Sequence, residues 1–145
     1  MSRQNRAPVP SSWGRTIGRF VLGAFMMFAG IGHFAAVDSF AAQVPPWMPF
    51  PEAIIYVSGV IEIALALGLW FAPRHLRPMV GWALAGFYVV IFPGNISQYL
   101  TGADAFGMVS DTARLVRLFF QPVLIVLALW CTGAWASYRS NRRSI

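Results

Sequence analysis

Four long apolar segments, separated by short polar or proline-rich stretches, dominate the pattern of this chain. They cover residues 20–36, 53–72, 79–100 and 118–138. A helix needs roughly 20 residues to cross about 30 Å of hydrocarbon, and each segment is close to that length. The pattern therefore predicts an all-α membrane protein, an antiparallel bundle of four transmembrane helices with spans of about 17–36, 53–72, 79–100 and 116–138.

The stretches between these segments contain residues that end helices. Residues 43–51 and 73–78 contain several prolines, and residues 102–111 are rich in glycine and aspartate. Short connections of this kind join neighbouring helices that run in opposite directions. The expected organisation is a disordered tail over 1–13, a membrane domain over 14–138 and a basic tail over 139–145.

Composition supports a membrane environment and argues against nucleic acid as a partner. Hydrophobic residues make up 57% of the chain and charged residues 11%, whereas soluble domains have about 25% charged residues. The net charge of +6 comes from arginine alone, because the chain contains no lysine. The arginines flank the apolar segments, where they can meet anionic lipid head groups, and no basic stripe with interleaved aromatics suits single-stranded nucleic acid.

The distribution of arginine predicts the orientation in the bilayer. With the N-terminus inside, Arg114 and Arg117 lie outside and the other nine of the 11 arginines lie in the cytoplasm. This asymmetry follows the positive-inside rule, so both termini are expected to be cytoplasmic. We therefore expect a multi-pass membrane protein.

A cleavable secretory signal is an alternative interpretation of the first span. The chain begins with several arginines, and the small residues Ser39 and Ala41 resemble a cleavage site. The apolar core of the span is long for such a signal, which favours a membrane helix.

Polar residues within the apolar segments converge on the outer half of the predicted bundle. Helical spacing places one set of polar side chains at a similar depth on the inward faces of the four helices. Since polar groups are costly inside a bilayer, we predict a ligand-binding pocket there, with Trp47 at its rim. The predicted site residues are His33, Trp47, Ser58, Glu62, Asn95, Gln98, Arg117 and Gln121.

Structural roles are the competing interpretation of the same residues. Glu62 and Arg117 can form an ion pair between helices, and Asn95 and Gln98 can bond one helix to another. His33 can bond a neighbouring carbonyl. A zinc or bis-histidine haem site is not expected, since His75 lies in a loop on the opposite side. Cys131 is the single cysteine, so paired-thiol redox chemistry is excluded for this chain alone.

Five stretches, in order along the chain, are similar to patterns of DoxX-like membrane proteins. They are Gly-Ile-Gly-His-Phe at 30–34, Val-Pro-Pro-Trp-Met-Pro at 44–49, Ser-Gly-Val-Ile-Glu at 58–62, Phe-Pro-Gly-Asn-Ile at 92–96 and Arg-Leu-Phe-Phe-Gln at 117–121. The resemblance covers about 14–138 and implies a four-helix, multi-pass domain of the cell inner (plasma) membrane. Some DoxX-like proteins are associated with thiosulfate oxidation coupled to quinone, and others with membrane complexes that handle oxidative stress.

These observations lead to three hypotheses about function. The leading one is a non-enzymatic accessory or anchoring subunit of a redox-linked complex, with a quinone or another lipid-like molecule in the outer pocket. The pocket lacks the nucleophile, base and orienting group that covalent catalysis requires. The alternatives are a small proton-coupled transporter or permease, which four helices would form as a homo-oligomer, and a membrane chaperone or structural module.

Overall fold

The computed structural model describes residues 12–142, and this range is helical without any strand. The helices are α1 (Trp13–Ala35), α2 (Val37–Ala41), α3 (Pro51–Phe71), α4 (Arg77–Thr101), α5 (Asp111–Cys131) and α6 (Ala134–Arg142). The four helices α1, α3, α4 and α5 are long and apolar enough to cross a membrane, which confirms the predicted all-α class with four candidate membrane-spanning helices. The tail predicted over 1–13 lies outside the described residues except for its last two positions, and Trp13 already begins α1.

Local sequence explains where the long helices begin. The side chain of Ser12 accepts a hydrogen bond from the Arg15 amide, and that of Ser110 accepts one from the Ala113 amide. Both serines therefore cap an exposed first turn, at α1 and α5. Helices α3 and α4 instead begin with a proline in the first turn. Backbone N–H groups in the first turn have no acceptor within the helix, so the N–H that proline lacks costs no hydrogen bond there.

The last predicted span is divided in the structure. We expected a helix of about 116–138, whereas α5 ends at Cys131 and a separate helix, α6, contains Tyr138. Gly133 has a φ of 74°, a left-handed conformation that favours glycine and turns the chain. Residues 139–142 of the predicted basic tail belong to α6, and residues 143–145 lie outside the described residues.

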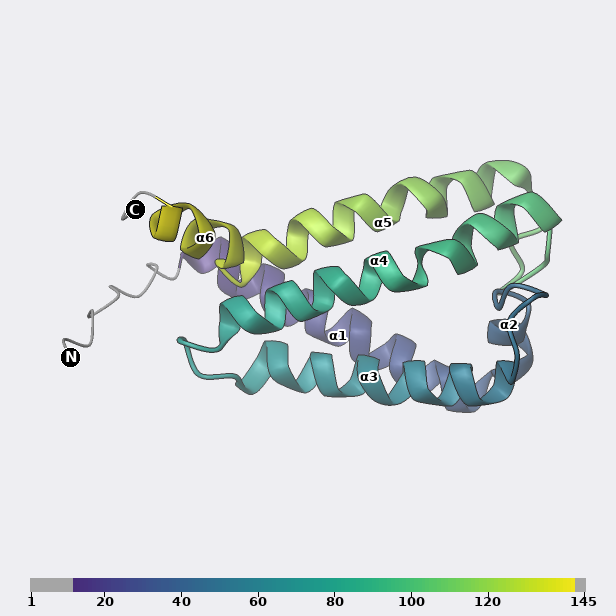
Figure 1. Ribbon diagram of the computed structural model, residues 1–145, viewed down its shortest axis with the longest axis horizontal. Helices are drawn as coiled ribbons and strands as arrows, with labels where there is room; N and C mark the ends of the chain where they lie inside the picture. Colours follow the sequence, from purple (N-terminus) through teal and green to yellow (C-terminus); the bar gives the residue numbers. More distant parts are fainter. Residues whose placement is uncertain (1–11, 143–145) are drawn as a thin grey trace.

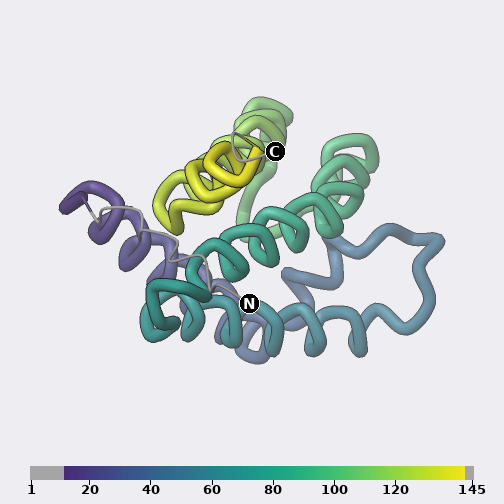
Figure 2. The backbone as a smooth tube through the Cα atoms, turned by 60° about the vertical axis from the view of Figure 1, so that its left-hand side comes forward, coloured from purple at the N-terminus to yellow at the C-terminus, as the bar shows by residue number. Residues whose placement is uncertain are grey.

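The long helices associate mainly as two pairs. Helix α1 packs most extensively on α3, and α4 packs on α5. In Figure 1 the connections between long helices alternate between two ends, with α6 at one end and α2 at the other. We call these the α6 end and the α2 end. Figure 2 shows the two pairs from another side, with the extended loop that follows α2.

The two pairs are joined by an apolar core. Its fully or largely buried members come from all four long helices and include the inward residues of α3 and α5 nearer the α6 end. The core consists of Leu22, Met26, Ala66, Leu69, Leu84, Tyr88, Leu124, Ala128 and Cys131. Toward the α2 end this core gives way to polar side chains and a cavity.

Two glycines allow α1 and α3 to approach closely near the α2 end. A Cβ on Gly30 would lie 3.0 Å from the Gly59 carbonyl oxygen, and a Cβ on Gly59 would lie 2.7 Å from the Cβ of His33. His33 and Glu62 each follow one of these glycines by three residues, so they lie on the same helix faces. The glycine crossing therefore brings the two side chains together.

Candidate functional site

A cavity of about 1040 Å³ lies between the helix pairs toward the α2 end. All four long helices contribute to its wall, and the loop after α2 closes over it with Val44, Pro45 and Met48. Most of the lining side chains are apolar. The volume is large enough for a small molecule with a substantial apolar body.

Six of the eight predicted site residues line this cavity. They are His33, Ser58, Glu62, Asn95, Arg117 and Gln121. Trp47 does not line it, because the loop leaves this side chain 72% exposed at the α2 end. Gln98 is 1% exposed but also lies outside the lining, where its Nε2 donates to the Ala103 carbonyl 3.4 Å away.

His33 and Glu62 form the most buried titratable pair in the cavity wall. The Nδ1 of His33 lies 2.9 Å from the Ala29 carbonyl and 3.2 Å from Oε2 of Glu62. This nitrogen carries at most one proton, and it meets hydrogen-bond geometry toward the Ala29 carbonyl. The contact with Glu62 has ion-pair distance without hydrogen-bond geometry, and Oε2 has no hydrogen-bond partner among the described residues. The imidazole is held by stacking on Phe40, with ring centroids 3.7 Å apart.

Arg117 enters the cavity wall from α5 and bonds to an amide. One of its terminal nitrogens donates to Oε1 of Gln43, in the loop after α2, at 2.5 Å. Among the described residues Arg117 has no carboxylate within salt-bridge distance, so the ion pair between Glu62 and Arg117 considered from the sequence does not form. A guanidinium carries five N–H donors, and the contact with Gln43 uses one of them.

Asn95 and Gln121 connect α4 to α5 at the cavity wall. The side-chain nitrogen of Asn95 donates to Oε1 of Gln121, and Nε2 of Gln121 donates to the Tyr88 carbonyl at 2.5 Å. Pro93 lies within α4 and lacks the N–H that a helix interior requires, which weakens the preceding turn. The Gln121 amide supports that turn, so these two residues position the wall.

Arg114 fixes the loop between α4 and α5 beside the cavity. Its guanidinium is buried and lies 2.7 Å from Asp104 and 2.8 Å from Asp111, both carboxylates being exposed. Met108, in the same loop, lines the cavity. Asp104 and Asp111 therefore pair with Arg114 and not with Arg117.

Gln43 and Phe40 are site residues that the sequence did not indicate. Gln43 orients Arg117 and Phe40 stacks on His33, and both line the cavity. They lie around the short helix α2 and the loop after it, where no helical period extends from the first span. The only signal in the sequence is the position of Gln43 as the first residue of the proline-rich stretch.

Comparison with known proteins finds one curated protein that is similar to this chain over part of its length, and one family model that matches most of the chain. A glycerol uptake facilitator protein of Pseudomonas aeruginosa is 32% identical over 100 residues, which is 67% of this chain and 34% of that protein. The chain thus spans about a third of the length of that curated relative. No solved structure matches the chain. A family model described as "Domain of unknown function (DUF8561)" matches residues 22–132, a range that contains every residue that lines the cavity. The chain therefore belongs to the DUF8561 family.

Proposed function

We propose that this chain is a multi-pass protein of the cell inner membrane whose long helices run antiparallel, with both termini cytoplasmic. Arginines at the α6 end support this orientation: Arg15, Arg74, Arg77, Arg139 and Arg142 belong to segments located there. Four acids belong to segments at the α2 end, namely Asp38, Glu52, Asp104 and Asp111.

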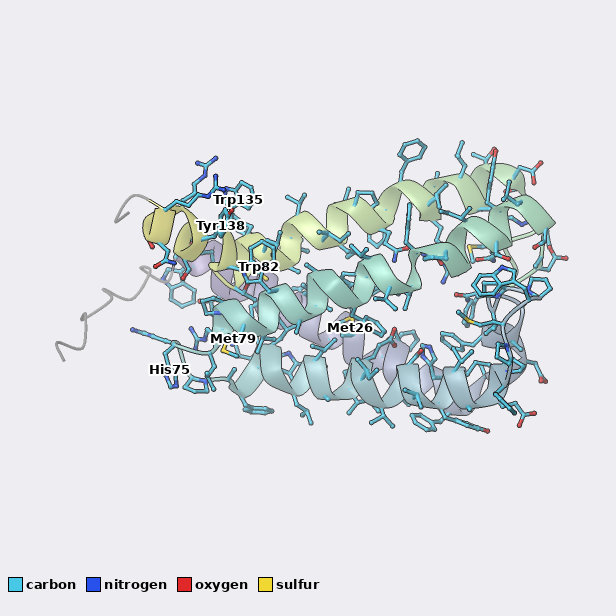
Figure 3. All side chains as sticks on the ribbon, in the orientation of Figure 1. Met26, His75, Met79, Trp82, Trp135 and Tyr138 are labelled. Carbon is cyan, nitrogen blue, oxygen red and sulfur yellow. The ribbon has the colours of Figure 1, made fainter. Side chains whose placement is uncertain are left out.

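Aromatic residues support the same placement of the α6 end. Figure 3 shows Trp82, Trp135 and Tyr138 gathered there, and the ring centroids of Trp82 and Tyr138 are 6.1 Å apart. Arg139 lies over the Trp135 ring at 5.4 Å. Tryptophan, tyrosine and arginine together are typical of the boundary between lipid and water.

The proposed function of the cavity is to bind a lipid-like small molecule as an accessory or anchoring subunit. The observation that carries this proposal is an apolar cavity of about 1040 Å³ whose wall contains a carboxylate oxygen, Oε2 of Glu62, without a hydrogen-bond partner. A buried polar group normally has a partner, and a ligand polar group would supply one. The apolar lining would hold the rest of the ligand.

A quinone bound beside a redox partner subunit is the specific form of this proposal that the DoxX-like resemblance suggests. The ring carbonyls of a quinone are acceptors, which suit the unused donors of Arg117. His33 and Glu62 would accept or release the protons that accompany quinone reduction. The partner would supply the electrons, because the chain has a single cysteine and cannot form a thiol pair.

Glu62→Gln is expected to weaken retention of the bound molecule by about tenfold or more, because it replaces a carboxyl group of the cavity wall with an amide. The measurement is native mass spectrometry of gently purified protein, which reports adduct mass and occupancy. Val89→Ala is the matched control, since Val89 is 60% exposed on α4 and does not line the cavity. An adduct that survives unchanged in Glu62→Gln and His33→Ala would remove these residues from the site.

Passage of a small polyol is a second candidate function, favoured by the similarity to a glycerol uptake facilitator. Proteoliposomes containing the chain would then swell faster in a glycerol gradient than empty liposomes, and Glu62→Gln would change that rate. Swelling equal to that of empty liposomes would eliminate this candidate. Co-purification of a stoichiometric partner without any small-molecule adduct would instead favour the chaperone or structural role.

A further inference from the structure

The cavity is bounded differently on its two sides. Between α1 and α5, the rings of Phe25 and Phe120 meet edge to face with centroids 6.3 Å apart, and both residues line the cavity. Between α3 and α4, no hydrogen bond, ion pair or ring contact joins the helices within the described residues. The cavity wall between α3 and α4 therefore lacks the ring contact that joins α1 to α5.

Close contacts limit this side of the cavity toward the α6 end and toward the α2 end. Near the α6 end, a Cβ on Gly68 of α3 would lie 3.3 Å from the side chain of Val80 on α4. At the α2 end, a Cβ on Gly94 of α4 would lie 3.0 Å from the Gln43 carbonyl oxygen, so the loop after α2 lies against α4. An opening between α3 and α4 would therefore lie in the middle of the two helices, between these contacts.

The residues beside this opening face both the cavity and the surroundings of the bundle. Val57 and Ile61 of α3 are 58% and 39% exposed, Val90 of α4 is 75% exposed, and all three line the cavity. They are apolar and belong to helices that can span a membrane. A ligand that used this opening would come from the hydrocarbon of the bilayer.

Charge inside the cavity indicates the chemistry of the ligand head. Arg117 keeps its charge in proteins, and its recorded partner is the neutral amide of Gln43. Glu62 acts on Arg117 from beyond salt-bridge distance and lies 3.2 Å from His33 instead, and Arg114 holds Asp104 and Asp111. A cation without a paired anion is costly in an apolar cavity, and an incoming carboxylate would form a two-pronged pair with the guanidinium.

Resting on the proposed lipid-like ligand, we propose that the natural occupant is an acidic amphiphile with a single apolar chain. Its carboxylate binds Arg117, its chain fills the cavity, and the end of the chain leaves between α3 and α4 into the bilayer. The site is therefore loaded sideways from the membrane. This assignment ranks an ionised head group above the neutral ring of a quinone, and the test below compares the two.

The test uses the full chain in phosphatidylcholine nanodiscs with oleate, methyl oleate and a short-chain ubiquinone analogue as probes. Oleate is expected to bind about tenfold more tightly than its ester, and Arg117→Gln should abolish this preference while Arg117→Lys retains part of it. Photolabelling with a fatty acid that carries a diazirine near its chain end should mark the α3 and α4 segments around Val57 and Val90. Val90→Trp should reduce this labelling severalfold, whereas Val89→Trp should not.

Equal binding of oleate and methyl oleate, or labelling that Val90→Trp leaves unchanged, would overturn the inference. If the ubiquinone analogue binds in a Glu62-dependent manner and oleate has no advantage, the acidic ligand is wrong while the proposed binding function stands. If none of the three probes binds, both the inference and the proposed function fail. Because Val90 is exposed, the tryptophan variant tests the opening even if Arg117→Gln does not fold.

Discussion

Gly59→Ala is expected to lower the free energy of unfolding by about 2 kcal/mol and to abolish ligand retention. The added Cβ would lie 2.9 Å from the Phe34 ring and 3.0 Å from the Gly30 carbonyl oxygen, so α1 and α3 must move apart. Backbone cannot yield as a flexible side chain does. Separation of the helices would also draw Glu62 away from His33, which is one helical turn from the crossing.

Gly86→Ala is the matched control for this experiment. Gly86 also lies within a long helix, but a Cβ there would meet no atom within 4 Å. Alanine has the higher helix propensity, so the control should be neutral or more stable by up to about 1 kcal/mol. Unfolding in mixed micelles, followed by circular dichroism, measures both changes. Equal effects of the two substitutions would contradict the importance of the close crossing.

Arg19→Met should destabilise the protein by about 2 kcal/mol, because it removes charge-assisted hydrogen bonds that close the end of α3. Arg19 is 5% exposed, and its guanidinium donates to the carbonyls of Leu69 and Trp70. These carbonyls belong to the last turn of α3, where helical partners are absent and a cation is favoured by the helix dipole. Methionine preserves much of the side-chain volume without any donor.

Arg15→Met provides the comparison for Arg19, because Arg15 lies one turn earlier on the same helix. Its recorded hydrogen bond uses the backbone amide, which the substitution retains. Thermal unfolding in detergent should therefore separate the two variants, with a clear loss for Arg19→Met and little change for Arg15→Met. A similar loss in both would attribute the effect to overall charge at the α6 end.

Hydropathy predicted the fold because hydrocarbon imposes a fixed helix length. The four apolar segments correspond to α1, α3, α4 and α5 to within a few residues at most ends. The break after Cys131 was missed, since the apolar pattern continues past Gly133 and conceals the local left-handed turn. Helix α2 is five residues long, too short to carry a detectable period.

Helical spacing predicted which faces carry the site but not the pairing of its residues. Spacing alone placed His33 and Glu62 at one depth, whereas their contact depends on the close approach of Gly30 to Gly59. The ion pair considered from the sequence joined Glu62 to Arg117 instead, and it does not form. The choice of Gln43 for Arg117 depends on the path of a proline-containing loop, for which periodicity gives no prediction. The same loop turns Trp47 outward.

The most direct test of the central claim is a structure of the protein in nanodiscs of its native lipids, determined by electron cryomicroscopy with a rigid antibody fragment. The account predicts elongated density within the cavity, with its polar end within hydrogen-bond distance of Arg117 or Glu62 and its other end between α3 and α4. A cavity closed by contact between α3 and α4, with no density for a bound molecule, would contradict it.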